Sequence, residues 1–286
     1  MKYKGLISFS VLIIFSSLMF IYGCSDDGGT EEESEWTLVW EDEFEGAAGQ
    51  APNTTKWAYN IGTGWGNNQL EYTTDRPENV SLDGNGNLAI TAREEDYLGA
   101  RYTSARITTQ GKFETTYGRF EARIKMPFGV GIWPAFWMLG TECEVEVNPD
   151  GSCCNGAEGW PECGEIDIVE LRGQEQTKMH GSIHGPGYSG GNPVTSIYSL
   201  NNSRFDTEFH EFAVEWTEGR IDFFVDGVNY QSISSDDVPG EWVYDNDFYM
   251  ILNVAVGGFF AGNPDSSTIL PQTMSVDYVR VYEKTN

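Results

Sequence analysis

Three carboxylates lie within six residues in the stretch GEIDIVELRG, residues 164–173. On a helix, at about 100° per residue, Glu165, Asp167 and Glu170 would share no common face. On a strand, Glu165 and Asp167 share a face because they are two residues apart, whereas Glu170 would point the opposite way. One extra residue between Asp167 and Glu170, a β-bulge, would return Glu170 to that face. The sequence therefore predicts a bulged strand that carries three acids side by side.

Acids in this arrangement suit the chemistry of a glycosidic bond. Retaining glycosidases use two carboxyl groups about 5 to 5.5 Å apart, and inverting enzymes need a wider gap for a water molecule. Like charges that close cannot all ionise freely, so one carboxyl keeps its proton. The alternatives are a solvated acidic strand or a calcium site. Calcium favours flexible turns, whereas apolar residues alternate with these acids, so we favour the catalytic interpretation.

Aromatic and amide side chains precede the acids. Trp133 and Trp137 share a strand face in GIWPAFWMLG, and exposed indoles of this kind stack on sugar rings. Ordinary core packing is the alternative, but the nearby acids favour a sugar platform. The stretch GTGWGNNQLEYTT, residues 62–74, has the composition of a binding loop, and three of its side chains could bond hydroxyl groups: Asn67, Asn68 and Glu71.

The elements that must position these residues are strands. In residues 117–127 charged and apolar residues alternate until Pro127, as in a half-buried strand. Residues 220–233 predict a hairpin, because Asp226-Gly227 can form a type I′ turn. No helix longer than a turn or two is expected. The prediction is an all-β, two-sheet antiparallel sandwich over residues 36–286, formed as one domain.

The amino-terminal residues predict export. Two lysines precede the apolar run of residues 6–23, and Cys24 follows a small residue as in a bacterial lipobox. We therefore expect a lipoprotein-type signal peptide at residues 1–23, with Cys24 lipidated and anchored to a membrane, in the outer membrane and on the cell surface as one version of this prediction. A single membrane-spanning anchor is the alternative. Residues 24–35 are acidic and predict a flexible tether.

The net charge of −27 limits which binding partners the protein can have. So acidic a surface repels nucleic acids, anionic membranes and sulfated polymers within about 10 Å. A neutral polysaccharide fits better, with a membrane reached only through the lipid anchor. We expect a monomer.

Four cysteines lie within 21 residues just before the acids: Cys143, Cys153, Cys154 and Cys163. In an exported protein this clustering indicates one or two disulfides, with three pairings open when two form. Zinc binding is less favoured because paired C-x-x-C spacing is missing. Residues 140–163 predict a long, ordered, functional loop.

With these residues in view, the chain resembles glycoside hydrolase family 16, and its laminarinases in particular. GEIDIVE matches the family signature E-x-D-x-x-E in its bulged form. Further matches occur in the family's order over residues 36–286: WEDEF, GWGNN, YTSARI, YGRFEARIKMP, GIWPAFWML, HGPGY, FHEFAVEWT, ILNVAVGG and VDYVRVY.

The resemblance implies a concave, concanavalin-like β-jelly roll that cleaves β-1,3-glucan by a retaining double displacement. It makes Glu165 the nucleophile, Glu170 the general acid/base and Asp167 the residue that positions the nucleophile. The side chains it implies for substrate binding are Trp133, Trp137, His184, Asn68 and Asn253. Taken alone, His184 would more often be structural.

The resemblance also implies no catalytic cofactor and a structural calcium held by Glu43, Gly86 and Asp277. Two departures stand out. Phe259-Phe260 follow VAVGG where the family has Asn-Trp, and the cysteine-rich insertion of residues 141–163 is longer than usual.

An endo-β-1,3-glucanase is the leading hypothesis, with a mixed-linkage β-1,3-1,4-glucanase close to it. An agarase or carrageenase of the same fold is less favoured, because sulfated galactans call for a basic binding surface and the chain has 17 basic against 44 acidic residues. A β-glucan-binding module is the alternative outside enzymes, but such proteins typically lose the catalytic glutamates.

Overall fold

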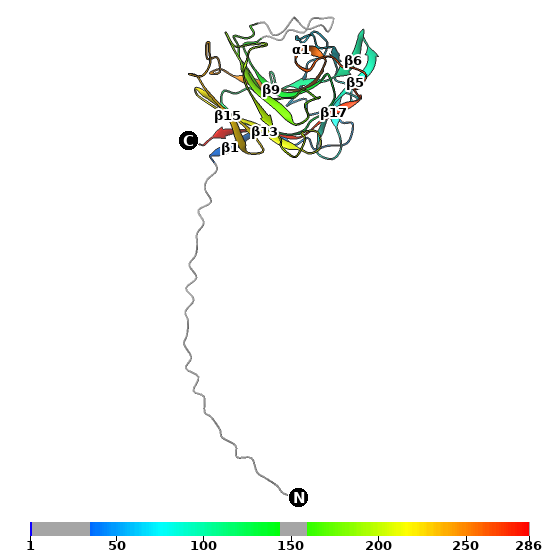
Figure 1. Cartoon of the computed structure of the whole chain (residues 1–286), viewed down its shortest axis with the longest axis horizontal. Helices are drawn as coiled ribbons and strands as arrows, with labels where there is room; N and C mark the ends of the chain where they lie inside the picture. The colour runs from blue at the N-terminus through cyan, green and yellow to red at the C-terminus, as the bar shows by residue number, and fades with distance from the viewer. Residues whose placement is uncertain (2–34, 144–158, 286) are drawn as a thin grey trace. The chain divides into compact units, whose positions relative to one another are not determined.

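The computed structural model describes residue 1 and residues 35–143 and 159–285. Apart from residue 1, the expected signal peptide lies outside these residues, as do Cys24, the tether up to residue 34, Cys153 and Cys154. Residues 35–286 form one compact unit, which Figure 1 shows with β1 and the carboxyl-terminal strand side by side. Within the described ranges, no helix has the length and apolar character needed to cross a membrane.

Two β-sheets build the unit. The larger one has ten strands, which are β1 (Trp36–Asp42), β3 (Glu71–Thr73), β4 (Val80–Leu82), β5 (Leu88–Tyr97), β6 (Ala100–Ser104), β8 (Gly118–Lys125), β13 (His210–Thr217), β14 (Arg220–Val225), β15 (Val228–Ser234) and β17 (Gln272–Lys284). The smaller one has seven strands, in the order β12 (Val194–Ser199), β11 (Lys178–His184), β10 (Glu165–Glu170), β9 (Ile132–Gly140), β16 (Phe248–Val256), β7 (Arg106–Thr108) and β2 (Ala58–Tyr59). Among the named strands, all pairings are antiparallel except β3 with β6. The all-β sandwich predicted from the sequence is confirmed.

The core lies between the two sheets. Phe120, Phe212 and Val279 of the larger sheet join one buried apolar cluster with Phe136 and Leu252 of the smaller sheet. Because successive strand residues point to opposite faces, their neighbours in β9 and β16 point away from this cluster. These neighbours form the opposite face of the seven-stranded sheet.

Regular strand signals in the sequence are realised. The hairpin forms between β14 and β15, with φ of 49° at Asp226 and 74° at Gly227 in the left-handed region that a type I′ turn needs. β8 ends at Lys125, two residues before Pro127. The one helix among the described residues is α1 (Gly258–Ala261), a single turn, as the absence of helical periodicity predicts.

The predicted bulge is present in β10. Its register shifts between Asp167 and Glu170 against β11, and between Asp167 and Val169 against β9. Ile168 is the extra residue, and both Ile168 and Val169 enter the core cluster. Two consecutive apolar residues thus face the core, which lets Glu170 regain the face of Asp167.

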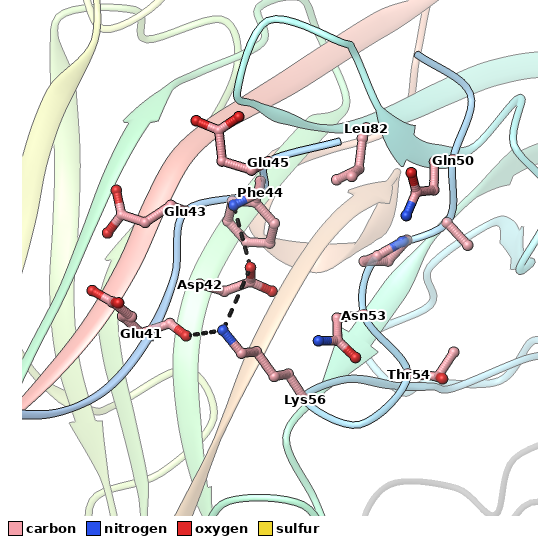
Figure 2. A pocket seen from close by; sticks show the side chains of 12 residues that line it. Glu41, Asp42, Glu43, Phe44, Glu45, Gln50, Asn53, Thr54, Lys56 and Leu82 are labelled. Atoms are coloured by element: carbon pink, nitrogen blue, oxygen red, sulfur yellow. Dashed lines mark hydrogen bonds and ion pairs between the residues drawn. The ribbon is translucent and has the colours of Figure 1, made fainter. Parts of the chain in front are cut away.

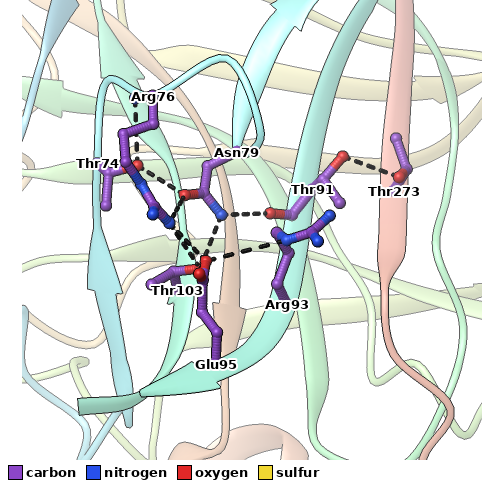
Figure 3. Close-up of polar contacts among 8 residues, drawn as sticks. All are labelled: Thr74, Arg76, Asn79, Thr91, Arg93, Glu95, Thr103 and Thr273. Atoms are coloured by element: carbon purple, nitrogen blue, oxygen red, sulfur yellow. Dashed lines mark hydrogen bonds and ion pairs between the residues drawn. The ribbon is translucent and has the colours of Figure 1, made fainter. Parts of the chain in front are cut away.

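A polar network fixes the turn that follows β3 (Figure 3). The buried amide of Asn79 donates to Thr91 O and to Thr103 Oγ1, both at 3.0 Å. Its carbonyl oxygen accepts from Thr74 Oγ1 at 2.7 Å and from Arg76 at 2.9 Å. Because a buried amide is stable only when its polar atoms are paired, this network ties the end of β3 to β5 and β6.

Candidate active site

The face of the seven-stranded sheet that points away from the core carries the acids, and we call it the carboxylate face. Glu165, Asp167 and Glu170 stand opposite His184, Ser182 and His180 of β11, respectively. Met179 and Ile183 of β11 belong to the core cluster, so the histidines lie on the other face. The structure therefore brings the predicted acids and His184 together on one surface.

Each glutamate accepts a hydrogen bond from a different indole. Trp160 Nε1 donates to Glu165 Oε2 at 2.9 Å, and Trp133 Nε1 donates to Glu170 Oε1 at 2.9 Å. Gly164 precedes Glu165 with φ of 80°, and a Cβ there would lie 2.8 Å from Phe248. A larger residue would therefore displace the start of β10 and the carboxylate of Glu165 with it.

Asp167 lies between the glutamates and is 3 % exposed. His184 Nε2 is 3.1 Å from Asp167 Oδ2 and 3.7 Å from Glu165 Oε1. The backbone N–H of Gly190 points at His184 Nδ1 at 3.1 Å. Because Nδ1 accepts this N–H, neutral His184 carries its proton on Nε2, the ring nitrogen that lies beside Asp167.

Burial and mutual repulsion raise the pKa values of the two glutamates. Burial raises the pKa of Glu170, and the charges of Asp167 and Glu165 raise it further. Burial and Asp167 also raise the pKa of Glu165, but His184 and the Trp160 N–H oppose this rise. His184 and the Trp133 N–H oppose the rise at Glu170 in the same way, but Arg106 favours the charged form of Glu165 as well. We therefore assign the negative charge to Glu165 and the proton to Glu170.

Burial lowers the pKa of His184, but its bond to Asp167 and the charges of Glu165 and Glu170 outweigh burial and raise the pKa to about 9. The Gly190 N–H at Nδ1 disfavours a second ring proton. In either charge state Nε2 carries the ring proton that lies nearest Asp167.

The residues predicted to bind sugar differ in their contacts and in their exposure. Trp137 Nε1 donates to Asn253 Oδ1 at 2.7 Å, which pairs two of them. Trp133 is 8 % exposed and packs against Phe260, with ring centroids 5.0 Å apart. Asn68 is exposed in the loop before β3. Sugar stacking by the two indoles stays a prediction.

Two further residues at this face, Arg106 and Trp160, were not predicted from the sequence as members of the site. Arg106 has its guanidinium 4.9 Å from the Trp65 ring and 4.8 Å from the Trp137 ring. Glu71, proposed from the sequence as a hydroxyl partner, is instead 2 % exposed and accepts the Val256 N–H at 2.8 Å. Trp160 binds Glu165. The Trp-Pro pair five residues before the acids was the only signal in the sequence for Trp160. A turn has no regular periodicity, so this signal could not predict where the indole points.

Among the described residues, one group of His, Cys, Asp and Glu is close enough to hold a metal ion: Glu165, Asp167 and His184, with ligand atoms within 4.8 Å of one another. The Gly190 N–H at Nδ1 leaves the proton of neutral His184 on Nε2, so the ring nitrogen nearest the acids has no lone pair to offer a metal. The arrangement suits acid–base chemistry better than metal binding.

The residues predicted for calcium lie at the larger sheet. Both carboxylate oxygens of Glu43 accept from Arg280, at 2.7 and 3.0 Å, and Asp277 pairs with Arg123. These carboxylates do not fit a cation site as arranged, because their oxygens already serve guanidinium groups. Calcium binding stays a prediction that requires both ion pairs to open.

A pocket of about 650 Å³ lies beside β1 and the loop that follows it (Figure 2). Four acids contribute to its lining, Glu41, Asp42, Glu43 and Glu45, together with Lys56, which bonds the Glu41 carbonyl. Since β1 belongs to the larger sheet, this pocket is separate from the carboxylate face.

Comparison with known proteins decides the family. A sequence model of glycosyl hydrolases family 16 matches residues 65–280. The chain belongs to glycoside hydrolase family 16. The matched range contains the bulged strand, both indoles that bind the glutamates, and His184.

Relatives of this family 16 chain agree with that assignment. The β-glucanase of Rhodothermus marinus is 39 % identical over 276 residues, which cover 93 % of this chain and 92 % of the relative. The laminarinase catalytic domain of Thermotoga maritima superposes with a TM-score of 0.77 at 44 % identity, covering 88 % of this chain and 99 % of that one. The endo-β-1,3-glucanase of Pyrococcus furiosus gives a TM-score of 0.77 at 42 % identity, with 88 % and 95 % covered.

Proposed function

We propose that this family 16 hydrolase is a retaining endo-β-1,3-glucanase that acts on laminarin-like glucans. The observation that carries the proposal is the bulge in β10, which sets Glu165 and Glu170 on one face with Asp167 between them. The named activities of the similar laminarinases and glucanases support the substrate class. The net charge of −27 favours a neutral polymer.

In the first step, a carboxylate oxygen of Glu165 attacks the anomeric carbon while Glu170 gives its proton to the glycosidic oxygen. The C–O bond to the leaving sugar breaks, and an ester forms between Glu165 and the retained sugar. Glu170 accepts the Trp133 N–H on Oε1, so Oε2 is left to carry the transferable proton.

In the second step, the Glu170 carboxylate takes a proton from water, and the hydroxyl oxygen attacks the anomeric carbon. The ester bond breaks and Glu165 regains its negative charge. Asp167 and His184 hold each other beside Glu165 throughout. Two inversions at one carbon leave the product with the β-configuration of the substrate.

Product analysis tests the proposal. We expect residues 36–286 to release short β-1,3-glucans from laminarin, to cut lichenan less efficiently and to leave agarose intact. Proton NMR during hydrolysis should show the β-anomer first, and a first-formed α-anomer would contradict the retaining mechanism. Preferred cleavage of lichenan would instead identify a mixed-linkage enzyme. If laminarin binds but no polymer is cut, a β-glucan-binding role would replace the enzyme.

We also propose, from the residues alone, that the chain is exported, lipid-anchored through Cys24 and monomeric. Metabolic labelling with a radioactive fatty acid should label the full chain and not Cys24→Ala. Equal labelling of both would contradict the anchor, and sedimentation of residues 36–286 tests the monomer.

A further inference from the structure

A disulfide joins the end of β9 to the residues just before β10. It links Cys143 to Cys163, two residues before Glu165, with the Cα atoms 5.4 Å apart. This separation is ordinary for a disulfide. The two cysteines are 0 % and 2 % exposed, so the bridge is part of the packed interior.

The two joined segments are already in backbone contact. The Gly140 N–H donates to Gly164 O at 3.1 Å, and within the turn itself the Cys163 N–H donates to Gly159 O at 3.0 Å. A Cβ at Gly140 would lie 1.9 Å from Cys163 O, so only glycine permits this approach. The disulfide covalently fixes the turn of residues 159–164 against the end of β9.

The disulfide also contacts residues of the carboxylate face. The two cysteines form a buried cluster with Leu139, Tyr249 and Ile251, and the indoles of Trp137 and Trp160 pack against this cluster. Trp160 therefore rests on the disulfide cluster on one side, while its ring lies 5.9 Å from the His184 ring.

Trp160 differs from Trp133 in how its position is determined. Trp133 lies in β9, where ladder pairing with β16 fixes its backbone. Trp160 lies in a turn outside the strands. Its N–H nevertheless reaches Glu165 at 2.9 Å, the same distance at which the Trp133 N–H reaches Glu170. A turn residue needs another restraint to hold such a bond.

We propose that the Cys143–Cys163 disulfide is that restraint, a positioning device that holds the Trp160 N–H against the carboxylate of the nucleophile. The inference rests on the proposed role of Glu165. Trp160 acts through Glu165, and the disulfide acts through Trp160.

Loss of the disulfide removes a cross-link that closes a 20-residue separation, so the turn gains conformational freedom. The Trp160 N–H then no longer stabilises the negative charge of Glu165. A hydrogen bond donated to a charged carboxylate lowers the pKa of that carboxyl by about one unit. The protonation of Glu165 should therefore move to higher pH when the disulfide is removed.

NMR of the indole N–H groups tests the proposal without substrate. The Trp160 signal, identified by its loss in Trp160→Phe, should shift with pH as Glu165 titrates in the wild-type chain. In the double variant Cys143→Ala/Cys163→Val, which keeps apolar side chains at both sites, this pH-dependent shift should disappear. The Trp133 signal is the matched internal control, because the same kind of bond there involves no disulfide.

The proposal is overturned if the Trp160 signal titrates identically with and without the disulfide while the Trp133 signal persists. If the double variant does not fold, the comparison is made on the wild-type chain in dithiothreitol, which reduces the disulfide to two thiols and is itself oxidised to a cyclic disulfide. Retention of the wild-type Trp160 titration after reduction would overturn the proposal equally.

Kinetics separate this inference from the proposed function. If the wild-type chain cleaves laminarin, the acid limb of kcat/KM should move up by about one pH unit in Trp160→Phe and in the cysteine variant, and no further in the triple variant. If the shifts of the acid limb in Trp160→Phe and in the cysteine variant add up in the triple variant, the disulfide does not act through Trp160. Trp242→Phe, which removes a bond to the Asp245 side chain, should leave the profile unchanged. If no glucan is cleaved, the proposed function fails, and the NMR comparison still decides the inference.

Discussion

The indole N–H of Trp133 donates to Oε1 of Glu170 at 2.9 Å. A side chain expected from the sequence to be a sugar platform thus also orients the proposed acid/base. The bond occupies one carboxyl oxygen and leaves the other to hold the proton. Two neighbouring strands, β9 and β10, supply the pair.

Trp133→Phe should lower kcat about tenfold, because Glu170 loses the bond that orients it. The N–H lowers the pKa of Glu170 against the effect of burial, so its loss should also move the alkaline limb of the pH profile upward. The measurement is kcat and kcat/KM on laminarin across pH. Trp242→Phe is the matched control, and a KM effect alone would contradict the orienting role.

Substitution of the two glutamates should give different products with azide. Glu170→Ala should lose at least about 100-fold in kcat, and azide should restore turnover of a substrate with a good leaving group by forming a β-glycosyl azide. Glu165→Ala should instead form the α-glycosyl azide, because azide then attacks directly. Product NMR distinguishes them. An exchanged pair of products would reverse the two assigned roles.

Hydrolysis should be most efficient at a pH above the usual range of free carboxyl groups. The nucleophile must be ionised, so activity falls on the acid side as Glu165 gains a proton, and it falls on the alkaline side as Glu170 loses one. Burial raises both pKa values, so both limbs should lie above the value of 4.5 for a free glutamate. A profile of kcat/KM against pH, with an acid limb at the ordinary carboxyl value, would contradict this environment for Glu165.

His184→Ala should lower kcat/KM by about 100-fold, because buried Asp167 loses the imidazole 3.1 Å away and no longer holds Glu165 in place. His184→Gln, which can offer an amide N–H, should recover part of the loss. The control is His210→Ala, which removes a histidine 2.7 Å from Asp226 on the other sheet and should change stability without changing kcat. Equal losses in both variants would indicate a purely structural role for His184.

Glu71→Gln should change how stability depends on pH. Burial raises the pKa of Glu71 from 4.5 to about 7, against the Val256 N–H. Between these values the folded chain keeps a proton that the unfolded chain has released, so the free energy of unfolding decreases as pH rises, by about 3 kcal/mol over the window. A neutral glutamine removes this dependence.

Urea unfolding at about pH 5 and about pH 8 measures the effect. From the lower to the higher pH, the free energy of unfolding of wild type should fall relative to that of Glu71→Gln. Glu283→Gln, at an exposed site of β17, should behave as wild type at both. A constant difference for Glu71→Gln would mean that the carboxyl does not titrate in this window.

The sequence by itself determined the strand faces and their interruptions. Alternation placed Trp133 and Trp137 on one face, and the spacing from Asp167 to Glu170 required a bulge that β10 contains. The Asp226-Gly227 turn could be predicted for the same reason. These features follow from contacts within a few residues, so local periodicity and turn chemistry are sufficient to predict them.

Only the tertiary structure decided which distant residues meet. The packing of separate strands and turns decides which of the other three cysteines pairs with Cys163 and which indole binds Glu165. It also decides that Arg280 forms an ion pair with Glu43. Glu71 became a buried acid for the same reason. The type of a side chain limits which partners it can bind. The partner that it actually meets is decided by strand order and close packing, and the residue spacing within one segment does not encode these.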